Sequence, residues 1–213
     1  MNGGQINPDL FYNKGNVLRY LQEYNDAKLC YVQAAKIDPS FSSSLLDIIA
    51  DIDSFLSRSC DLIQRNGQIK KKKWDSIMSR MMSSFQYSSH TTFSALTDSS
   101  SGENLKSLMV TVLMPITKGT TPPESFLCVD TEGKCGMISI YNIGANSAIF
   151  NNSSDSHIIT ISNPTVKVIV FEDKMPLFVA QVRNIQSIIV DGRSSINNKS
   201  VVGPKLAVNV LES

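Results

Sequence analysis

Hydrophobic residues recur every three or four positions through the first 82 residues of the chain, and every second position beyond residue 105. The first spacing is typical of amphipathic helices and the second of half-buried strands. The alternation is clearest from residue 108 to residue 116, where Leu, Val, Val, Met and Ile occupy every other position. The pattern therefore predicts an α+β chain in two domains, with helices at the N-terminal end and an all-β domain after them.

Residues 8–41 have the 34-residue length of one tetratricopeptide repeat (TPR), a pair of closely crossing antiparallel helices. Small and large residues fall at the spacing of that repeat, namely Phe11, Gly15, Leu18, Ala27, Tyr31, Ala34 and Pro39. Gly15 and Ala27 would let the two backbones approach, and Pro39 would end the second helix. Lys14 departs from the pattern, because the repeat usually has an apolar residue there.

The first helix of a repeat supplies the concave wall on which peptides bind. By the spacing of the repeat, the candidates for this peptide groove are Tyr12, Asn13, Asn16, Arg19 and Tyr20. Asn16 is the best suited of them to hydrogen-bond a peptide backbone. Met1 lies just before the repeat, so we expect a fragment, a short isoform or a truncated gene product without earlier repeats. A groove without its neighbours should bind peptides weakly.

A single repeat cannot bury its own apolar face, so a further element has to cover it. The apolar stripe of residues 45–63 predicts a capping helix that ends at Asn66-Gly67. A short helix over 68–82 follows, with Trp74 and Ile77 expected to point into the helical domain. Six cations and one anion fall within residues 65–80, which gives this window a net charge of +5 in a chain of net +1.

The lysine run at 70–73 has three readings: a contact for RNA phosphates, a localisation signal, or a solvated helix face. In each case Lys70, Lys72 and Lys73 are expected to be exposed, because a run of lysines cannot be buried without partners. The neutral charge of the whole molecule excludes a general attraction to nucleic acid or membrane. Any such interaction must therefore come from this segment.

Composition then divides the chain into domains. The helical domain would occupy 1–82, and the eight Ser and three Thr of 83–104 predict a flexible linker. Short strands at regular spacing across 105–192 predict a small barrel, with a helix or long loop near 142–150 and a hairpin at Asp130-Thr131-Glu132-Gly133. The turn-rich residues 193–213 are expected to be loosely ordered.

Catalysis, metal binding and membrane insertion find little support in the sequence. The four cysteines form no C-x-x-C motif, and His90 and His157 have neither a cysteine nearby nor a motif carboxylate. An enzyme using Asp130 or Cys135 would lack a paired base. No stretch is apolar enough to span a membrane, and the first residues do not resemble a signal peptide. We therefore expect a non-enzyme without cofactor, metal or membrane contact.

Together, the repeat, the run NGQIKKKK and the segment SFLCVDTEGKCGMISIYNI resemble the C-terminal half of the tetratricopeptide repeat protein 5 (Strap) family, in which stacked repeats precede an oligosaccharide/oligonucleotide-binding (OB) fold. The likeness runs from about Asn7 to Gly192. Its most specific residues are Phe126, Val129, Asp130, Gly133, Cys135, Tyr141 and Asn142.

This resemblance implies an adaptor of the cytoplasm and nucleus. One implied role is the assembly of a histone acetyltransferase complex in the stress response. The other is recognition of nascent tubulin at the ribosome, which leads to decay of tubulin mRNA. In that second role the lysine-rich segment faces ribosomal RNA, and the matching positions here are Lys70, Lys72 and Lys73.

A rival hypothesis is a single-stranded nucleic-acid binder that acts through the barrel. Such proteins combine a basic groove with stacking aromatic residues. Residues 83–213 carry nine cations and ten anions, so the groove is not evident. The candidate stacking residues lie in or beside apolar runs and are more typical of a core: Phe126, Tyr141, Phe150, Phe171 and Phe178. A protein-binding barrel is therefore the preferred interpretation.

Overall fold

The computed structural model describes residues 7–84, 90–95, 107–117, 123–141 and 156–192. The chain divides into two compact units, one reaching Leu56 and one starting at Ser57. This division lies within helix α3 (Ser42–Gln64), whereas the sequence placed the boundary in the linker 83–104. The end of α3 and the whole of α4 (Lys71–Ser83) are thus grouped with the strands instead of the repeat.

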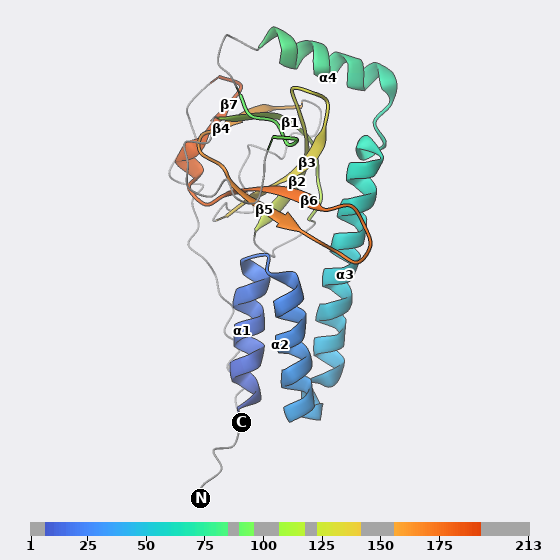
Figure 1. Cartoon of the computed structure of the whole chain (residues 1–213), viewed down its shortest axis with the longest axis vertical. Coiled ribbons are helices and arrows are strands. Elements are labelled where there is room, and N and C mark those ends of the chain that lie inside the picture. The colour runs from blue at the N-terminus through green and yellow to red at the C-terminus, as the bar shows by residue number, and fades with distance from the viewer. Residues whose placement is uncertain (1–6, 85–89, 96–106, 118–122, 142–155, 193–213) are drawn as a thin grey trace, which may run out of the picture. The chain divides into compact units, whose positions relative to one another are not determined.

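The first unit contains the predicted helix pair, α1 (Pro8–Tyr20) and α2 (Tyr24–Ile37) (Figure 1). Helix α1 begins at a proline, where the missing N–H is harmless, and the Asp9 N–H donates to Asn7 Oδ1 at 2.9 Å. Helix α2 stops before Pro39, which opens a short 3-10 turn. The prediction of a repeat-like hairpin over 8–41 is confirmed.

The close crossing of α1 and α2 depends on Gly15. A Cβ atom at this position would lie 2.5 Å from Cε1 of Tyr31, whose side chain is fully buried. We predict that Gly15→Ala lowers the free energy of unfolding by about 1–3 kcal/mol, because the helices must separate to admit the methyl group. Urea unfolding followed by far-ultraviolet circular dichroism measures this. Asn13→Ala, an exposed change on the same helix, is the control and should have little effect.

The first part of α3 packs on the repeat as a capping helix. Leu45 and Ile52 are buried, and Lys28 Nζ of α2 lies 2.7 Å from Asp53 Oδ1 of α3. The rings of Tyr24 and Phe55 are 5.7 Å apart between centroids. The helix is slightly longer than the predicted 45–63 and ends, as expected, at the turn Asn66–Gln68, where Gly67 has a positive φ of 65°.

Two buried tyrosines make the first unit sensitive to alkaline pH. Burial raises the pKa of Tyr24 and of Tyr31 to about 12. An unfolded chain releases these protons near pH 10, so their contribution to stability is complete below pH 10 and is lost as the pH rises towards 12. We predict a falling urea midpoint over that interval. Tyr24→Phe keeps the ring and should reduce the fall by roughly half; an unchanged fall would contradict the assignment.

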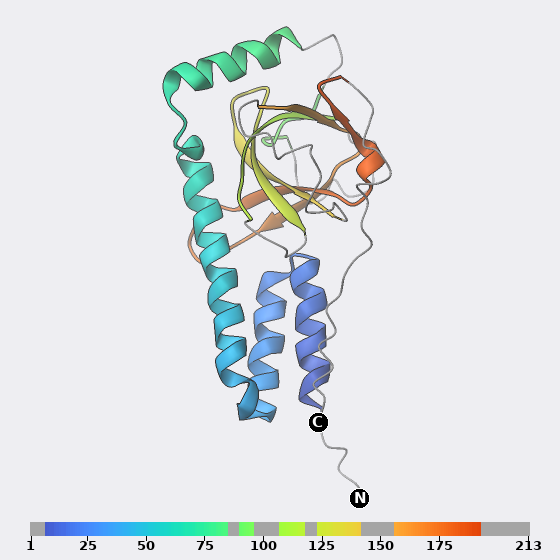
Figure 2. The ribbon, with the colours of Figure 1, turned by 180° about the vertical axis from the view of Figure 1, so that it is seen from behind.

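In the described part of the second unit, seven strands form one sheet in the order β5-β6-β3-β2-β1-β4-β7. They are β1 (Leu108–Pro115), β2 (Glu124–Asp130), β3 (Cys135–Ile140), β4 (Ile158–Ile161), β5 (Thr165–Ile169), β6 (Leu177–Val182) and β7 (Ile188–Val190). Residues from both end strands, Val166 of β5 and Ile188 of β7, join one buried cluster. The sheet is therefore rolled around a single core, as Figures 1 and 2 show.

The strands lie within 105–192, the interval in which short strands were predicted. Gly133 in the β2–β3 hairpin has a φ of 82°, which a glycine adopts without strain. Residues 185–187 form a 3-10 turn before β7, and the Asn184 Oδ1 at its start accepts from the Gln186 N–H. The predicted helix or loop at 142–150 and the loosely ordered tail at 193–213 lie outside the described residues.

Helix α4 and the turn before it pack on the outer face of this sheet. A Cβ at Gly67 would lie 2.8 Å from Leu127, and one at Gly133 would lie 3.8 Å from Trp74. The hydroxyl of Thr111 in β1 approaches the sulfur of Met81 at 3.5 Å. The prediction that Trp74 and Ile77 point into the helical domain is wrong for Trp74, whose neighbour is the β2–β3 hairpin. An amphipathic pattern identifies a buried face but not its partner.

The prediction of a flexible linker through 83–104 is also wrong for residues 90–95. Phe93 is fully buried in the barrel core, and its N–H donates to Asp130 Oδ2 at 2.8 Å. Thr91 forms a parallel bridge to Leu108. A Cβ at Gly136 would lie 2.6 Å from the Phe93 ring, so the glycine provides the slot that the ring fills.

Candidate functional site

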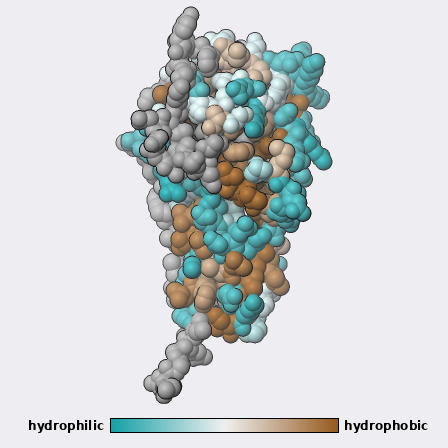
Figure 3. All heavy atoms as spheres, in the orientation of Figure 1, coloured by the Kyte–Doolittle hydropathy of each residue, from teal (hydrophilic) through white to brown (hydrophobic). Residues whose placement is uncertain are grey.

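The lysine segment lies exposed at the start of α4. Lys70 is the N-cap residue, and Lys72 and Lys73 belong to the first turn. The prediction that these three side chains are exposed is confirmed. The surface over the start of α4 is hydrophilic (Figure 3).

This placement does not serve helix stability. The first turn of α4 has no acidic residue, and Lys70 makes no side-chain capping bond. Positive charges at a helix N-terminus oppose the helix dipole, whereas an anion there would be favoured. The segment therefore suits an external anion better than it suits its own helix.

The predicted groove residues all lie on α1, and three of them surround Tyr31 of α2. The Tyr31 hydroxyl donates to Asn16 Oδ1 at 3.0 Å, and the rings of Tyr12 and Tyr31 are 6.3 Å apart. Burial raises the pKa of Tyr31, while the nearby Arg19 guanidinium acts in the opposite direction. Sequence reasoning assigned Tyr31 to packing alone and missed its hydroxyl, which orients Asn16.

The other two groove residues are less constrained by these contacts. Asn13 is exposed and Tyr20 is half-buried. Asn16 keeps its amide nitrogen for an external acceptor, because only its oxygen is engaged with Tyr31. The described part of α1 thus carries a polar row, but its role in peptide binding stays a prediction.

The barrel aromatics are not arranged for stacking on bases. Phe126, Tyr141 and Phe171 are buried, and Phe178 packs against the core while Lys134 Nζ lies 5.2 Å from its ring centroid. Phe150 lies outside the described residues. The interpretation of Phe126 as a core residue is confirmed, since it belongs to the central cluster.

The residues considered for catalysis have structural contacts. Asp130 is fully buried, and its Oδ1 accepts from the N–H groups of Glu132 and Lys134. Burial raises the pKa of the Cys135 thiol to about 12, which opposes formation of a reactive thiolate. Within the described ranges, no three His, Cys, Asp or Glu side chains come together as metal ligands. None of the described helices is long and apolar enough to cross a membrane.

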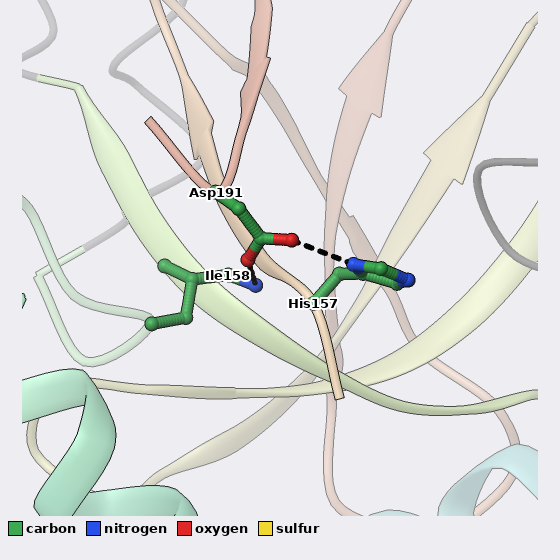
Figure 4. A network of polar contacts seen from close by, with 3 residues as sticks. All are labelled: His157, Ile158 and Asp191. Atoms are coloured by element: carbon green, nitrogen blue, oxygen red, sulfur yellow. Dashed lines mark hydrogen bonds and ion pairs between the residues drawn. The ribbon is translucent and has the colours of Figure 1, made fainter. Parts of the chain in front are cut away.

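One histidine does have a carboxylate partner. His157 Nδ1 lies 2.7 Å from Asp191 Oδ2, and Asp191 Oδ1 accepts from the Ile158 N–H at 3.0 Å (Figure 4). Partial burial raises the pKa of Asp191, but these two bonds, together with the charge interactions with His157 and Arg80, outweigh it and the pKa is lowered overall. The Asp191 N–H in turn donates to the Ile158 carbonyl. The contacts join the start of β4 to the end of β7, and so they fasten the end of the sheet.

Comparison with known proteins agrees with both units. The Tetratricopeptide repeat family model matches residues 8–41, the window predicted from spacing. The model of the Tetratricopeptide repeat protein 5 OB fold domain matches residues 87–203, more than half of the chain. The chain belongs to the tetratricopeptide repeat protein 5 family.

Two members of this family show how far the chain has diverged from them in sequence. Tetratricopeptide repeat protein 5 of Homo sapiens and that of Mus musculus are each 26% identical to the chain over 157 residues. The match covers 64% of this chain and 34% of each relative, so the chain spans about a third of their length. A TPR followed by an OB fold supports the interpretation of the chain as an adaptor, and repeats of this kind generally mediate contacts between proteins.

Proposed function

We propose that this adaptor docks on protein partners through its repeat and barrel while the lysine segment contacts RNA phosphate. The observation that carries the proposal is the placement of α4. Its apolar side packs on the barrel through Trp74 and Met81, which leaves Lys70, Lys72 and Lys73 exposed to solvent. Lysine heads on a supported helix can follow a phosphate backbone without recognising bases.

The settings that we propose for this contact are those implied by family membership. One is the ribosome, where the adaptor would recognise nascent tubulin and promote decay of tubulin mRNA. The other is transcription cofactor assembly with a histone acetyltransferase complex in the nucleus. The polar row on α1 supports a peptide contact, with the Asn16 amide as the donor to a backbone carbonyl.

Binding of single-stranded nucleic acid through the barrel is less well supported. Stacking needs exposed ring faces, and Phe126 and Tyr141 are 3% and 2% exposed. The described part of the barrel also presents no continuous row of cations comparable to residues 70–73. The lysine segment is therefore the better candidate for an RNA contact.

The dependence of RNA affinity on salt tests the proposal. Wild-type chain and the variant Lys70→Glu/Lys72→Glu/Lys73→Glu are compared by fluorescence anisotropy with a labelled RNA. A contact through lysines predicts a shallow slope and little base preference, and the triple variant should lose binding. Retained affinity in the triple variant would move the RNA site to the barrel.

A further inference from the structure

Beyond the lysine segment, the barrel carries one arginine that its neighbours hold in place. Arg183 is exposed and follows directly after strand β6. One terminal nitrogen of its guanidinium donates to Gln181 Oε1 at 3.2 Å, and its central carbon lies 5.9 Å from the centroid of the Tyr141 ring. Two side chains of the sheet thus restrict the position of this guanidinium.

The support beneath Arg183 is itself fixed. Gln181 and Tyr141 are 4% and 2% exposed, and the Gln181 amide nitrogen donates to the Tyr141 hydroxyl at 3.1 Å. Gln181 lies in β6, and Tyr141 directly follows β3, which pairs with β6 in parallel. The Tyr141 N–H donates to the carbonyl of Val182. A buried hydrogen-bonded pair therefore orients the guanidinium, so little side-chain entropy remains to be lost when a ligand binds.

The charge of Arg183 is not neutralised by a carboxylate of the described residues. A guanidinium has five N–H donors, of which Gln181 uses one. The rest form a planar fork whose geometry matches an oxyanion. Among the described residues, the arrangement therefore has the charge, the donors left without a partner and the fixed orientation that an anion site requires.

We propose that Arg183, held by Gln181 and Tyr141, is a docking site for an acidic side chain of a protein partner. A carboxylate is favoured over a nucleic-acid backbone because the residues placed next to Arg183 by sequence and strand register add no second cation. Val182 and Asn184 flank it, and the strand register places Thr165 opposite Gln181. Nucleic-acid strands are held by several cations together, whereas one arginine fork is sufficient for one carboxylate.

Side-chain NMR of the intact chain tests this site, with blocked tetraglutamate and a uridine oligonucleotide as probes. The Arg183 Nε–H resonance should shift and saturate with the peptide, at an affinity at least about five times that at Arg58, an exposed arginine outside the lysine segment that shares the general charge effect. Arg183→Lys keeps the charge but loses the planar fork. The affinity for the peptide, followed in this variant by the shift of the Asn184 amide resonance, should be several-fold weaker. Arg58→Lys is the matched control and should leave the response of the Asn184 amide to the peptide unchanged.

Three results would overturn the proposal. One is an equal affinity at Arg183 and Arg58, which would indicate non-specific attraction. Another is unchanged affinity in Arg183→Lys, which would show that the fork plays no part. The third is tighter binding of the oligonucleotide than of the peptide at Arg183, which would make phosphate the ligand. All three results are independent of whether the lysine segment binds RNA, because Lys70 and its neighbours are unaltered in these variants.

Discussion

Phe93→Ala is expected to lower the free energy of unfolding of the barrel unit by about 3–5 kcal/mol. The ring is fully buried and lies against Gly136, where even a Cβ would meet it at 2.6 Å. Its removal leaves a cavity among closely packed strands, and the rigid sheet can collapse around it only in part. The backbone N–H of residue 93 would also be held less firmly to the buried carboxylate of Asp130.

Urea unfolding followed by tryptophan fluorescence measures this loss of stability in the barrel unit. Trp74 is the one tryptophan of the chain, and it lies half-buried beside Gly133 of the barrel hairpin. Ser94→Ala, an exposed change in the same segment, should alter stability by no more than about 0.5 kcal/mol. A loss below about 1 kcal/mol in Phe93→Ala would mean that the segment 90–95 does not belong to the core.

The segment around Phe93 shows where sequence reasoning fails. A single aromatic residue within a Ser/Thr-rich run has no periodicity, and it resembles a linker. Its burial depends on Asp130, which lies 37 positions away, and on the absence of a side chain at Gly136. The only hint of burial in the sequence is the lone Phe after a Thr-Thr pair. No nearby residue indicates that Gly136 leaves room for its ring.

The strands and the repeat were predictable because their signals are local. Alternation over 108–116 predicted a strand, and the turn glycine at 133 predicted a hairpin. Gly15 and Tyr31 at repeat spacing predicted the close crossing of the two helices. The apolar side of α4 was predicted as well, but its partner is a sheet far along the chain. Likewise, Gln181 and Arg183 are simply two positions apart in the sequence. They become a candidate site only through Tyr141, which follows β3 and is 40 positions away from Gln181.

Reversal of three lysine charges is expected to have the largest effect on RNA binding. The window 65–80 has a net charge of +5 and can neutralise about three or four phosphates. The logarithm of the binding constant should then fall with the logarithm of salt concentration at a slope near −3. At about 50 mM salt, the loss of three such contacts should reduce affinity by at least roughly a hundredfold.

The fold should be unaffected by these substitutions, because Lys70, Lys72 and Lys73 are exposed and the apolar side of α4 is unchanged. An unchanged emission maximum of Trp74 would verify this. Lys14→Glu/Lys36→Glu/Arg58→Glu changes the net charge by the same amount at exposed positions outside the segment, and serves as the control. The full chain is used throughout, since a barrel restricted to 105–192 would lack Phe93 and α4.

The most direct test is therefore the RNA affinity of wild-type chain, triple lysine variant and charge-matched control, each measured from about 50 mM to about 200 mM salt. We expect a slope near −3 for the wild-type chain and the control, similar affinity for RNAs of different base composition, and no measurable binding by the lysine variant. Wild-type affinity and slope in the lysine variant would contradict the account, because the RNA contact would then lie outside α4.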